Sequence, residues 1–77
     1  MTPLYRVLMK RGRRWQLWNN YHVYESAVEA ASALVQGGHT KVCQISKVTT
    51  DAVEVVAVVK TQPAVGWEYG RAVVTKQ

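Results

Sequence analysis

Apolar and polar residues alternate near the start of the chain, which is the pattern of a β-hairpin. Residues 4–9 form the first predicted strand and residues 14–19 the returning strand, with a turn over residues 10–13. Gly12 suits this turn because glycine adopts a positive φ without steric cost.

The same alternation assigns the side chains of this hairpin to two faces. One face is predicted to pack under a helix and carries Tyr5, Val7, Met9, Trp15 and Leu17. The other is predicted to stay open and carries Arg6, Leu8, Arg14, Gln16 and Trp18. The open side of the hairpin is therefore expected to combine cations with an aromatic ring.

A helix is predicted after the hairpin. Asn19-Asn20 indicates a turn or bulge, and residues 21–24 either continue the strand or lead into the helix. Ser26 and Glu29 match an S-x-x-E capping box, and Gly37-Gly38 supplies the helix end. The apolar helix face is Ala27, Val28, Ala30, Ala31, Leu34 and Val35.

The second half of the chain predicts more strands. Residues 40–48 and the valine-rich residues 52–61 form a second hairpin around a turn at 49–51. Residues 62–70 are predicted to be a loop, and residues 71–75 a short last strand. The expected fold is α+β: a single antiparallel sheet of four to five strands (β-β-α-β-β) with one helix packed on one face.

Length and composition predict one binding domain spanning residues 1–77. A 77-residue chain has room for one modest core. The net charge of +5 lies entirely in residues 1–24, because residues 25–77 hold equal numbers of basic and acidic side chains. Such asymmetry points to a localised surface for an acidic partner.

The sequence predicts a cytoplasmic protein without membrane association. A single cysteine, Cys43, precludes an intramolecular disulfide and fits a reducing compartment. The N-terminus has no apolar segment typical of a signal peptide, and no apolar run approaches the ~18 residues of a membrane span.

Residue patterns for catalysis or cofactor binding are absent, so we expect a non-enzymatic protein without cofactor. His22, His39 and Cys43 match no zinc-site spacing, and Cys43 is expected to be a buried apolar residue of a strand. The acidic residues are scattered and suggest no acid–base pair. Gly37-Gly38 follows a helix, whereas phosphate-binding glycines precede one.

The basic, aromatic N-terminal hairpin is the feature that stands out. Arginine pairs with phosphates and carboxylates, and an exposed tryptophan offers a flat apolar surface. The predicted binding residues are Arg6, Lys10, Arg11, Arg13, Arg14, Gln16 and Trp18. The alternative is a solvated turn whose arginines guard an edge strand.

A second candidate surface lies in the predicted loop at residues 62–70. Trp67 and Tyr69 are its candidate binding residues. The alternative is that one of these rings folds back to cover one end of a thin core.

The chain also shows two resemblances to known proteins. The stretch YRVLMKRGRRWQLWNNYHVYESAVEAASALV resembles the strand–turn–strand–helix opening of phage integrase arm-binding domains, which implies DNA recognition by a sheet. The valine-rich second hairpin departs from that pattern. The whole chain resembles small phage-encoded accessory proteins, including anti-CRISPR and other inhibitors, which implies blockage of a host protein or nucleoprotein machine and assigns no particular residue.

Two functions from different classes follow from the sequence. The first is a phage-type stoichiometric inhibitor that occludes a surface of a host protein or nucleoprotein complex. The second is direct binding of DNA or RNA through the basic hairpin. A homodimer through the exposed strand of a hairpin remains open as well.

Overall fold

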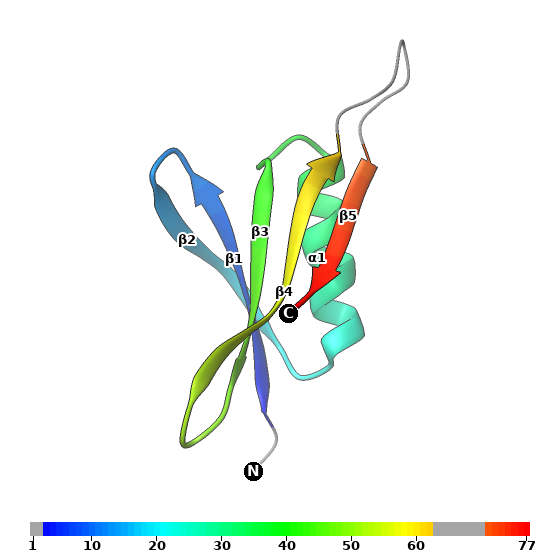
Figure 1. Cartoon of the computed structure of the whole chain (residues 1–77). Coiled ribbons are helices and arrows are strands. Elements are labelled where there is room, and N and C mark those ends of the chain that lie inside the picture. The colour runs from blue at the N-terminus through cyan, green and yellow to red at the C-terminus, as the bar shows by residue number, and fades with distance from the viewer. Residues whose placement is uncertain (1–2, 63–70) are drawn as a thin grey trace.

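The protein is described by a computed structural model covering residues 3–62 and 71–77. Its elements are β1 (Leu4–Arg11), β2 (Arg14–Tyr21), α1 (Tyr24–Gln36), β3 (Val42–Val48), β4 (Val53–Gln62) and β5 (Arg71–Lys76). The strands form one antiparallel sheet in the order β2-β1-β3-β4-β5, and α1 packs on one face (Figure 1). The predicted α+β fold is confirmed.

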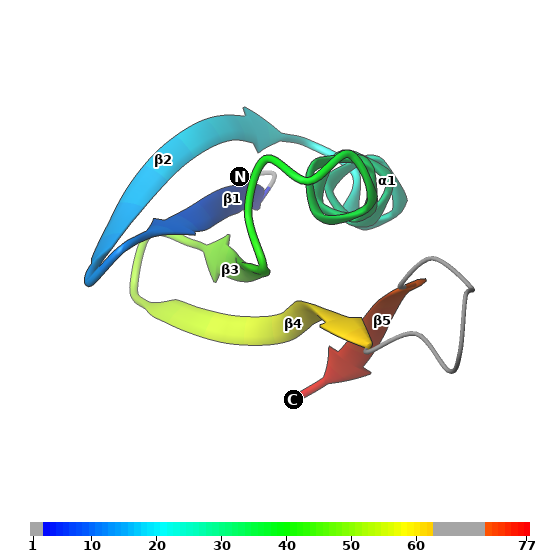
Figure 2. The same cartoon turned by 90° about the horizontal axis from the view of Figure 1, so that it is seen from above.

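The sheet curls around the helix. Seen from above, α1 lies between the two edge strands β2 and β5 (Figure 2), and it contacts all five strands. The small alanine side chains on the buried helix face permit this close approach. Ala27 and Ala31 are fully buried, so the helix lies in the hollow of the sheet.

One apolar core fills the space between α1 and the sheet. Its largest fully buried side chains are Ile45, Val7, Val59 and Cys43, which come from the three inner strands. Burial of such side chains contributes roughly 1.5–3 kcal/mol each. The complete core cluster is Val7, Met9, Ala27, Ala31, Leu34, Val35, Cys43, Ile45, Ala57 and Val59.

The first hairpin forms where the sequence predicts it. Arg11 pairs with Arg14, which leaves Gly12 and Arg13 as the two turn residues. Gly12 has φ +62° whereas Arg13 has no positive φ, which is the pattern of a type II′ turn. Both strands extend two residues beyond their predicted ends, and Tyr21 closes β2.

The predicted capping box at Ser26 is wrong. The helix begins at Tyr24 with Val23 as its N-cap residue, and no side chain caps it. Ser26 is therefore already inside the first turn. Tyr24 packs edge-on against Tyr5 of β1, with ring centroids 5.7 Å apart and planes at 68°. This tertiary contact extends the helix past the local capping signal.

The helix ends as predicted at the glycine pair. Gly37 is the C-cap residue, and Gly38 has φ +78°. The amide of His39 donates to the carbonyl of Leu34 at 3.0 Å, and the amide of Gly38 donates to the carbonyl of Val35 at 3.2 Å. These two bonds define a Schellman motif, which satisfies the last helix carbonyls.

The second hairpin and the short last strand are also confirmed. β3 begins at Val42, two residues later than expected, and a bulge interrupts its pairing with β4 between Ile45 and Ser46. β5 pairs with β4. Of the predicted loop at 62–70, Gln62 is the last residue of β4, and residues 63–70 lie outside the described residues.

The one helix of the described residues is too short to cross a lipid bilayer.

Candidate functional site

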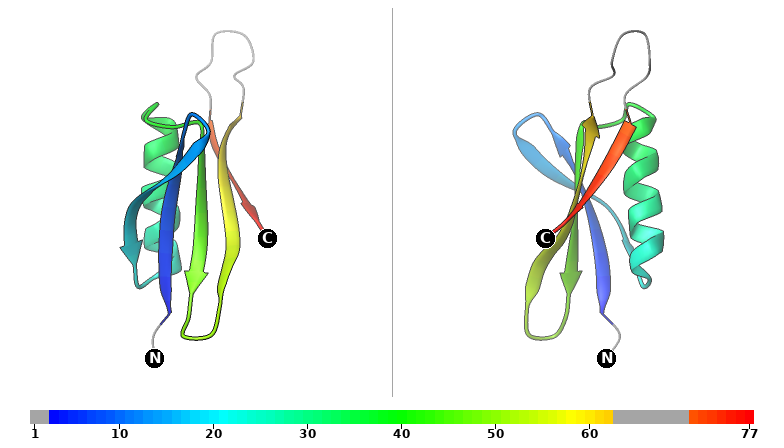
Figure 3. Two further views of the ribbon diagram at one scale, coloured as in Figure 1. Left: turned by 90° about the vertical axis from the view of Figure 1, so that its left-hand side faces the viewer. Right: turned by 45° about the vertical axis from the view of Figure 1, so that its right-hand side comes forward.

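The sheet has one face toward α1 and one face away from it, and we call the latter the open face. Within residues 3–62 and 71–77 no element packs on it, and the left view of Figure 3 looks onto it with α1 behind. Pairing registers assign it Leu4, Arg6, Leu8, Lys10, Trp15, Leu17, Asn20, Val42, Gln44, Ser46, Val48, Val53, Val55, Val58, Lys60, Val73 and Thr75.

The charges of the open face are all positive at its described positions. They belong to Arg6, Lys10 and Lys60. The hairpin tip, residues Arg11–Arg14, adjoins them. The acidic residues of the described chain lie elsewhere: on α1, in the β3–β4 turn, and at Glu54, which pairs with Lys47 on the opposite face. The described positions of the open face therefore carry positive charge only.

Trp15 gives the β1–β2 part of this face an aromatic surface. Its side chain is 43% exposed, and the ammonium group of Lys10 lies 5.8 Å from the ring centroid. Lys10 pairs directly with Trp15 across the β1–β2 ladder. This cation–π contact holds an aromatic plane and a charge side by side.

Exposed aliphatic side chains also lie on the open face. Val53, Val55 and Val73 on β4 and β5 are exposed, and Val53 reaches 62%. Leu17 on β2 is 49% exposed. Several large apolar side chains gathered on one face of a small domain indicate a contact surface.

Arg6 occupies an inner strand of this face. It lies opposite Asn20 of β2 and opposite Ser46 of β3. The side chain is half-buried, and its Nε atom is buried without a hydrogen-bond partner. A buried donor that lacks an acceptor is unusual in a folded protein.

The predicted faces of β2 are wrong for residues 14–18, because the register set at the turn differs from the predicted one and a bulge follows it. The β1–β2 register shifts between Val7 and Leu8, so that Val7 pairs with Asn19 while Leu8 pairs with Leu17. Trp18 is the extra residue. The two-residue turn pairs Lys10 with Trp15 and Leu8 with Leu17, so both residues lie on the open face and not under α1. The extra residue reverses the alternation beyond it and places Asn19 and Tyr21 on the helix side.

The register also moves three predicted binding residues off the open face. Gln16 pairs with Met9, whose side chain is buried toward α1, and Arg14 pairs with Arg11. Trp18 lines a shallow groove of about 340 Å³ beside α1. The other groove residues are Tyr21, Ala30, Ala33, Leu34 and His39.

The predicted binding residues therefore divide into three places. Arg6 and Lys10 lie on the open face, Arg11 to Arg14 at the hairpin tip, and Gln16 and Trp18 on the helix side. Sequence reasoning missed Trp15 and Leu17, as well as the valines of β4 and β5. Nothing in the sequence fixes the bulge position within residues 14–21, although Asn19-Asn20 indicated that one was near.

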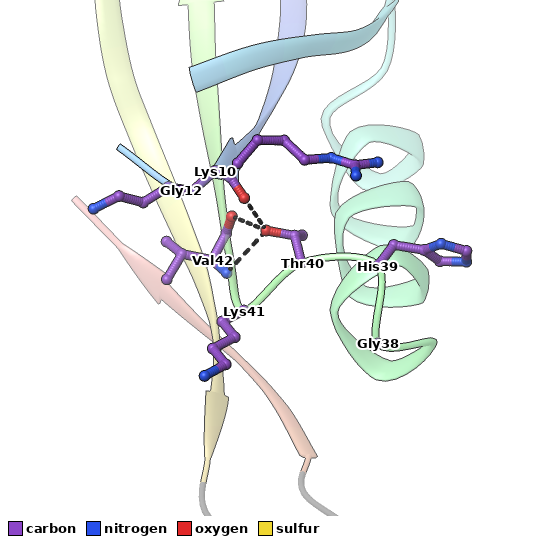
Figure 4. A pocket seen from close by; sticks show the side chains of 8 residues that line it. Lys10, Gly12, Gly38, His39, Thr40, Lys41 and Val42 are labelled. Atoms are coloured by element: carbon purple, nitrogen blue, oxygen red, sulfur yellow. Dashed lines mark hydrogen bonds between the residues drawn. The ribbon is translucent and has the colours of Figure 1, made fainter. Parts of the chain in front are cut away.

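A second hollow of about 510 Å³ lies between the hairpin tip and the loop after α1. The hydroxyl of Thr40 bridges these two segments by donating to the carbonyl of Lys10 at 2.8 Å (Figure 4). The side chains of Lys10, His39 and Lys41 point in different directions around it (Figure 4). They do not converge on one point where an anion could sit.

Cys43 is buried in β3, as predicted. Burial raises the pKa of its thiol to about 11. The thiol is therefore protonated near neutral pH and is a poor nucleophile or metal ligand. In residues 3–62 and 71–77, no three side chains of the His, Cys, Asp and Glu types gather closely enough to hold a metal ion.

Trp67 and Tyr69, the second predicted binding surface, lie outside the described residues.

Comparison with protein-family models, with curated proteins and with solved structures finds no match to this chain.

Proposed function

We propose that this chain is a non-enzymatic binding protein that docks its open face onto an acidic-rimmed patch of another protein and blocks that patch. One observation carries the proposal. The described positions of the open face combine exposed apolar side chains with cations and hold no acidic residue. Protein interfaces combine buried apolar side chains with charged and hydrogen-bonding ones.

The area available suits such a contact. A stable interface buries about 800 Å² on each partner, and the whole chain exposes 5646 Å². A contact of that size takes roughly one-seventh of the surface of the chain. Trp15 and the arginines of the hairpin tip are of the residue types that dominate interface energetics.

Aliphatic exposure favours a protein over a nucleic acid as partner. Burial of the exposed Val53, Val55 and Val73 is favourable only when another apolar surface covers them. Nucleic-acid interfaces, by contrast, are more polar and are dominated by phosphate contacts. Stoichiometric occlusion, the mode of the phage-encoded inhibitors that the chain resembles, is the action we propose for this docking.

The test begins with affinity capture by the immobilised chain, followed by purification of the captured protein. Calorimetry then compares wild type with Trp15→Ala and with Lys10→Glu plus Lys60→Glu, two cations of the open face. We expect each variant to weaken binding by about tenfold or more, since interface hot spots contribute at least ~2 kcal/mol. Unchanged affinity in both variants would overturn the proposal.

Matched controls separate the open face from general charge. Lys47→Glu plus Lys76→Glu changes the net charge by the same amount, but both residues lie on the helix side of the sheet, Lys47 opposite Tyr5 and Lys76 opposite Ala57. Val23→Ala shortens another exposed apolar residue, the N-cap of α1. Both controls are expected to bind within about threefold of wild type.

Direct nucleic-acid binding is the second candidate, favoured by the hairpin tip. Three arginines at Arg11, Arg13 and Arg14 adjoin Lys10, whose ammonium group lies over the exposed Trp15 ring. Titration with single- and double-stranded DNA and RNA at two salt concentrations tests it. Micromolar binding that weakens steeply with salt supports this candidate, and no binding near physiological salt excludes it.

A further inference from the structure

We propose that the outer edge of β2 and the groove beside it bind an extended segment of a partner protein, which adds to the sheet as a further strand. The segment carries an apolar anchor residue and, four residues after it, an acidic one. This surface is distinct from the open face, so the inference goes beyond the proposed function. Three observations carry it: a free strand edge, an apolar groove along that edge, and a cation at the start of the same strand.

β2 is an edge strand, and its outer side is free. Within residues 3–62 and 71–77 it pairs with β1 alone, and α1 lies on its other flank (Figure 2). Every residue of β2 except Tyr21 is exposed. A free edge presents unpaired backbone N–H and C=O groups, to which several peptide-recognition domains bind an extended segment as an added strand.

The turn decides which backbone groups of β2 point outward. In a hairpin with a two-residue turn, the pair that closes the turn, here Arg11 and Arg14, is hydrogen-bonded, and the pairs alternate from there. The N–H and C=O groups of Trp15 and Leu17 therefore point away from β1. Beyond the bulge the edge is less available, because the amide of Asn20 donates to the side-chain oxygen of the preceding residue at 2.8 Å. Pairing is therefore expected over the first half of β2.

The groove of about 340 Å³ lies between β2 and α1. Trp18 and Tyr21 line it from β2, and Ala30 and Ala33 line it from α1. Alanine leaves open the space that a larger side chain would fill, and Trp18 is 49% exposed. In an added strand, the residue opposite Trp18 points to the helix side, into this groove. It is the anchor, and an aromatic side chain suits the two rings that it meets.

Charge selects the rest of the segment. Arg14 is exposed at the start of β2, and its side chain lies on the same side of the sheet as that of Gln16. Antiparallel pairing is the commoner arrangement, and in it the residue opposite Arg14 follows the anchor by four positions. Opposite charges directly across a ladder are stabilising. The segment therefore has the order anchor, three intervening residues and an acid.

The same charges disfavour a second copy of this chain as the occupant. β2 contains no acidic residue, so the β2 strand of another copy offers Arg14 no counter-charge. The net charge of +5 also makes two copies repel each other. A nucleic acid does not match this edge either, because alternating N–H and C=O groups are complementary to another polypeptide backbone.

The probe is the synthetic peptide acetyl-Ser-Phe-Val-Thr-Val-Glu-Ser-amide, with phenylalanine as the anchor. Its two valines lie opposite Leu17 and Trp15 and hydrogen-bond to them. N-methylation of the valine opposite Trp15 removes one of these donors. N-methylation of the threonine, whose N–H points away from β2, is the matched control. Calorimetry measures affinity, and NMR hydrogen exchange follows the backbone amides of β2.

Two protein variants test the groove and the charge. Ala33→Leu fills the groove, and its control Gln36→Leu places leucine at another exposed position of α1, outside the groove. Arg14→Glu reverses the charge opposite the acid, and its control Arg13→Glu makes the same change in the turn. A second peptide, with lysine in place of glutamate, is measured against both charge variants.

We expect the wild-type chain to bind the first peptide, with slower hydrogen exchange at the amides of Trp15 and Leu17. The methylated valine and Ala33→Leu should each weaken binding by about tenfold, and their controls by less than about threefold. Arg14→Glu should weaken binding of the glutamate peptide by about fivefold and strengthen binding of the lysine peptide. Arg13→Glu should change either affinity by less than about threefold.

Several results overturn the inference. No binding of the peptide at about 1 mM, with exchange at Trp15 and Leu17 unchanged, is one. Equal affinities of the two methylated peptides, or of Ala33→Leu and wild type, are others. A dimer in ultracentrifugation that protects both amides without peptide assigns the edge to a second copy and also overturns it. Each of these results is independent of Trp15→Ala on the captured protein, which tests the proposed function separately.

Discussion

The hydroxyl group of Thr40 donates a 2.8 Å hydrogen bond to the backbone carbonyl of Lys10, thirty residues earlier in the chain. The same oxygen lies 3.4 Å from the amide of Val42 and accepts its hydrogen bond. Thr40 is only 7% exposed. This contact fastens the end of β1, next to the basic turn, to the segment between α1 and β3.

Replacing Thr40 by valine should destabilise the protein and loosen the basic hairpin. The variant keeps the shape of the side chain but leaves the Lys10 carbonyl without this donor, which costs about 1–3 kcal/mol. Denaturation by urea measures the loss. The control is Thr61→Val, whose exposed hydroxyl donates a longer 3.3 Å bond to Lys41; it should change stability by less than ~0.5 kcal/mol. Equal losses would refute the bridging role.

Two truncations of apolar strand residues should differ sharply in the stability that they cost. Ile45→Ala empties part of the core, where Ile45 is fully buried, and should cost about 2–5 kcal/mol. Leu17→Ala shortens a side chain that is 49% exposed on the open face, and should cost less than ~1 kcal/mol. Chemical denaturation of both variants provides the comparison. A large loss in Leu17→Ala would contradict the pairing of Leu17 with Leu8, because it would place Leu17 under the helix.

Substitution of Gly38 tests the end of the helix. Its φ of +78° lies in the left-handed region, and an added Cβ would meet nothing within 4 Å. Gly38→Ala should therefore lose about 1–2 kcal/mol through backbone strain alone. Gly38→Asn should lose less, since asparagine tolerates this conformation better. Thermal unfolding of both variants measures the two losses of stability. Equal losses would point to a side-chain clash and not to backbone strain.

The Cys43 thiol should make stability depend on pH in the alkaline range. Its pKa rises to about 11 in the folded chain from 9.0. Below pH 9 the contribution to stability is fully present. Between pH 9 and 11 the unfolded thiol ionises while the folded one does not, so the free energy of unfolding falls by about 1.4 kcal/mol per pH unit.

Cys43→Ala isolates this effect from other groups that titrate at alkaline pH. Urea denaturation at several pH values should give a shallower decline for the variant than for wild type. The native thiol should also resist alkylation by iodoacetamide at pH 8 and react after unfolding. Rapid alkylation of the folded chain would show that Cys43 is accessible.

The order of elements follows from local patterns. Alternation of apolar residues predicts the strands, and the alanine-rich stretch ending at Gly37-Gly38 predicts the helix. The helix starts three residues earlier than predicted, with Val23 and not Ser26 as N-cap, and Tyr24 gains a ring contact with Tyr5. That contact joins residues from separate elements, so no local signal such as the Ser26 capping pattern could reveal it.

The candidate site was predicted in part. The sequence located the cations of the first hairpin, and Arg6 and Lys10 do lie on the open face. It assigned Trp15 and Trp18 to the wrong sides because the two-residue turn sets the sides of residues 14–17, and Trp18 is the extra residue of the bulge that follows. A bulge depends on how β1 and β2 pair, which requires both strands together.

The sequence by itself determined the fold class and the location of the excess charge, because hydrophobic periodicity, turn residues and charge are local properties of the chain. Only the tertiary structure decided which side chains share the open face and that the Arg6 Nε atom is buried without an acceptor. Both depend on strand register and on curvature of the sheet around α1. These arise from packing between residues far apart in sequence, and they make one face of the sheet the candidate surface.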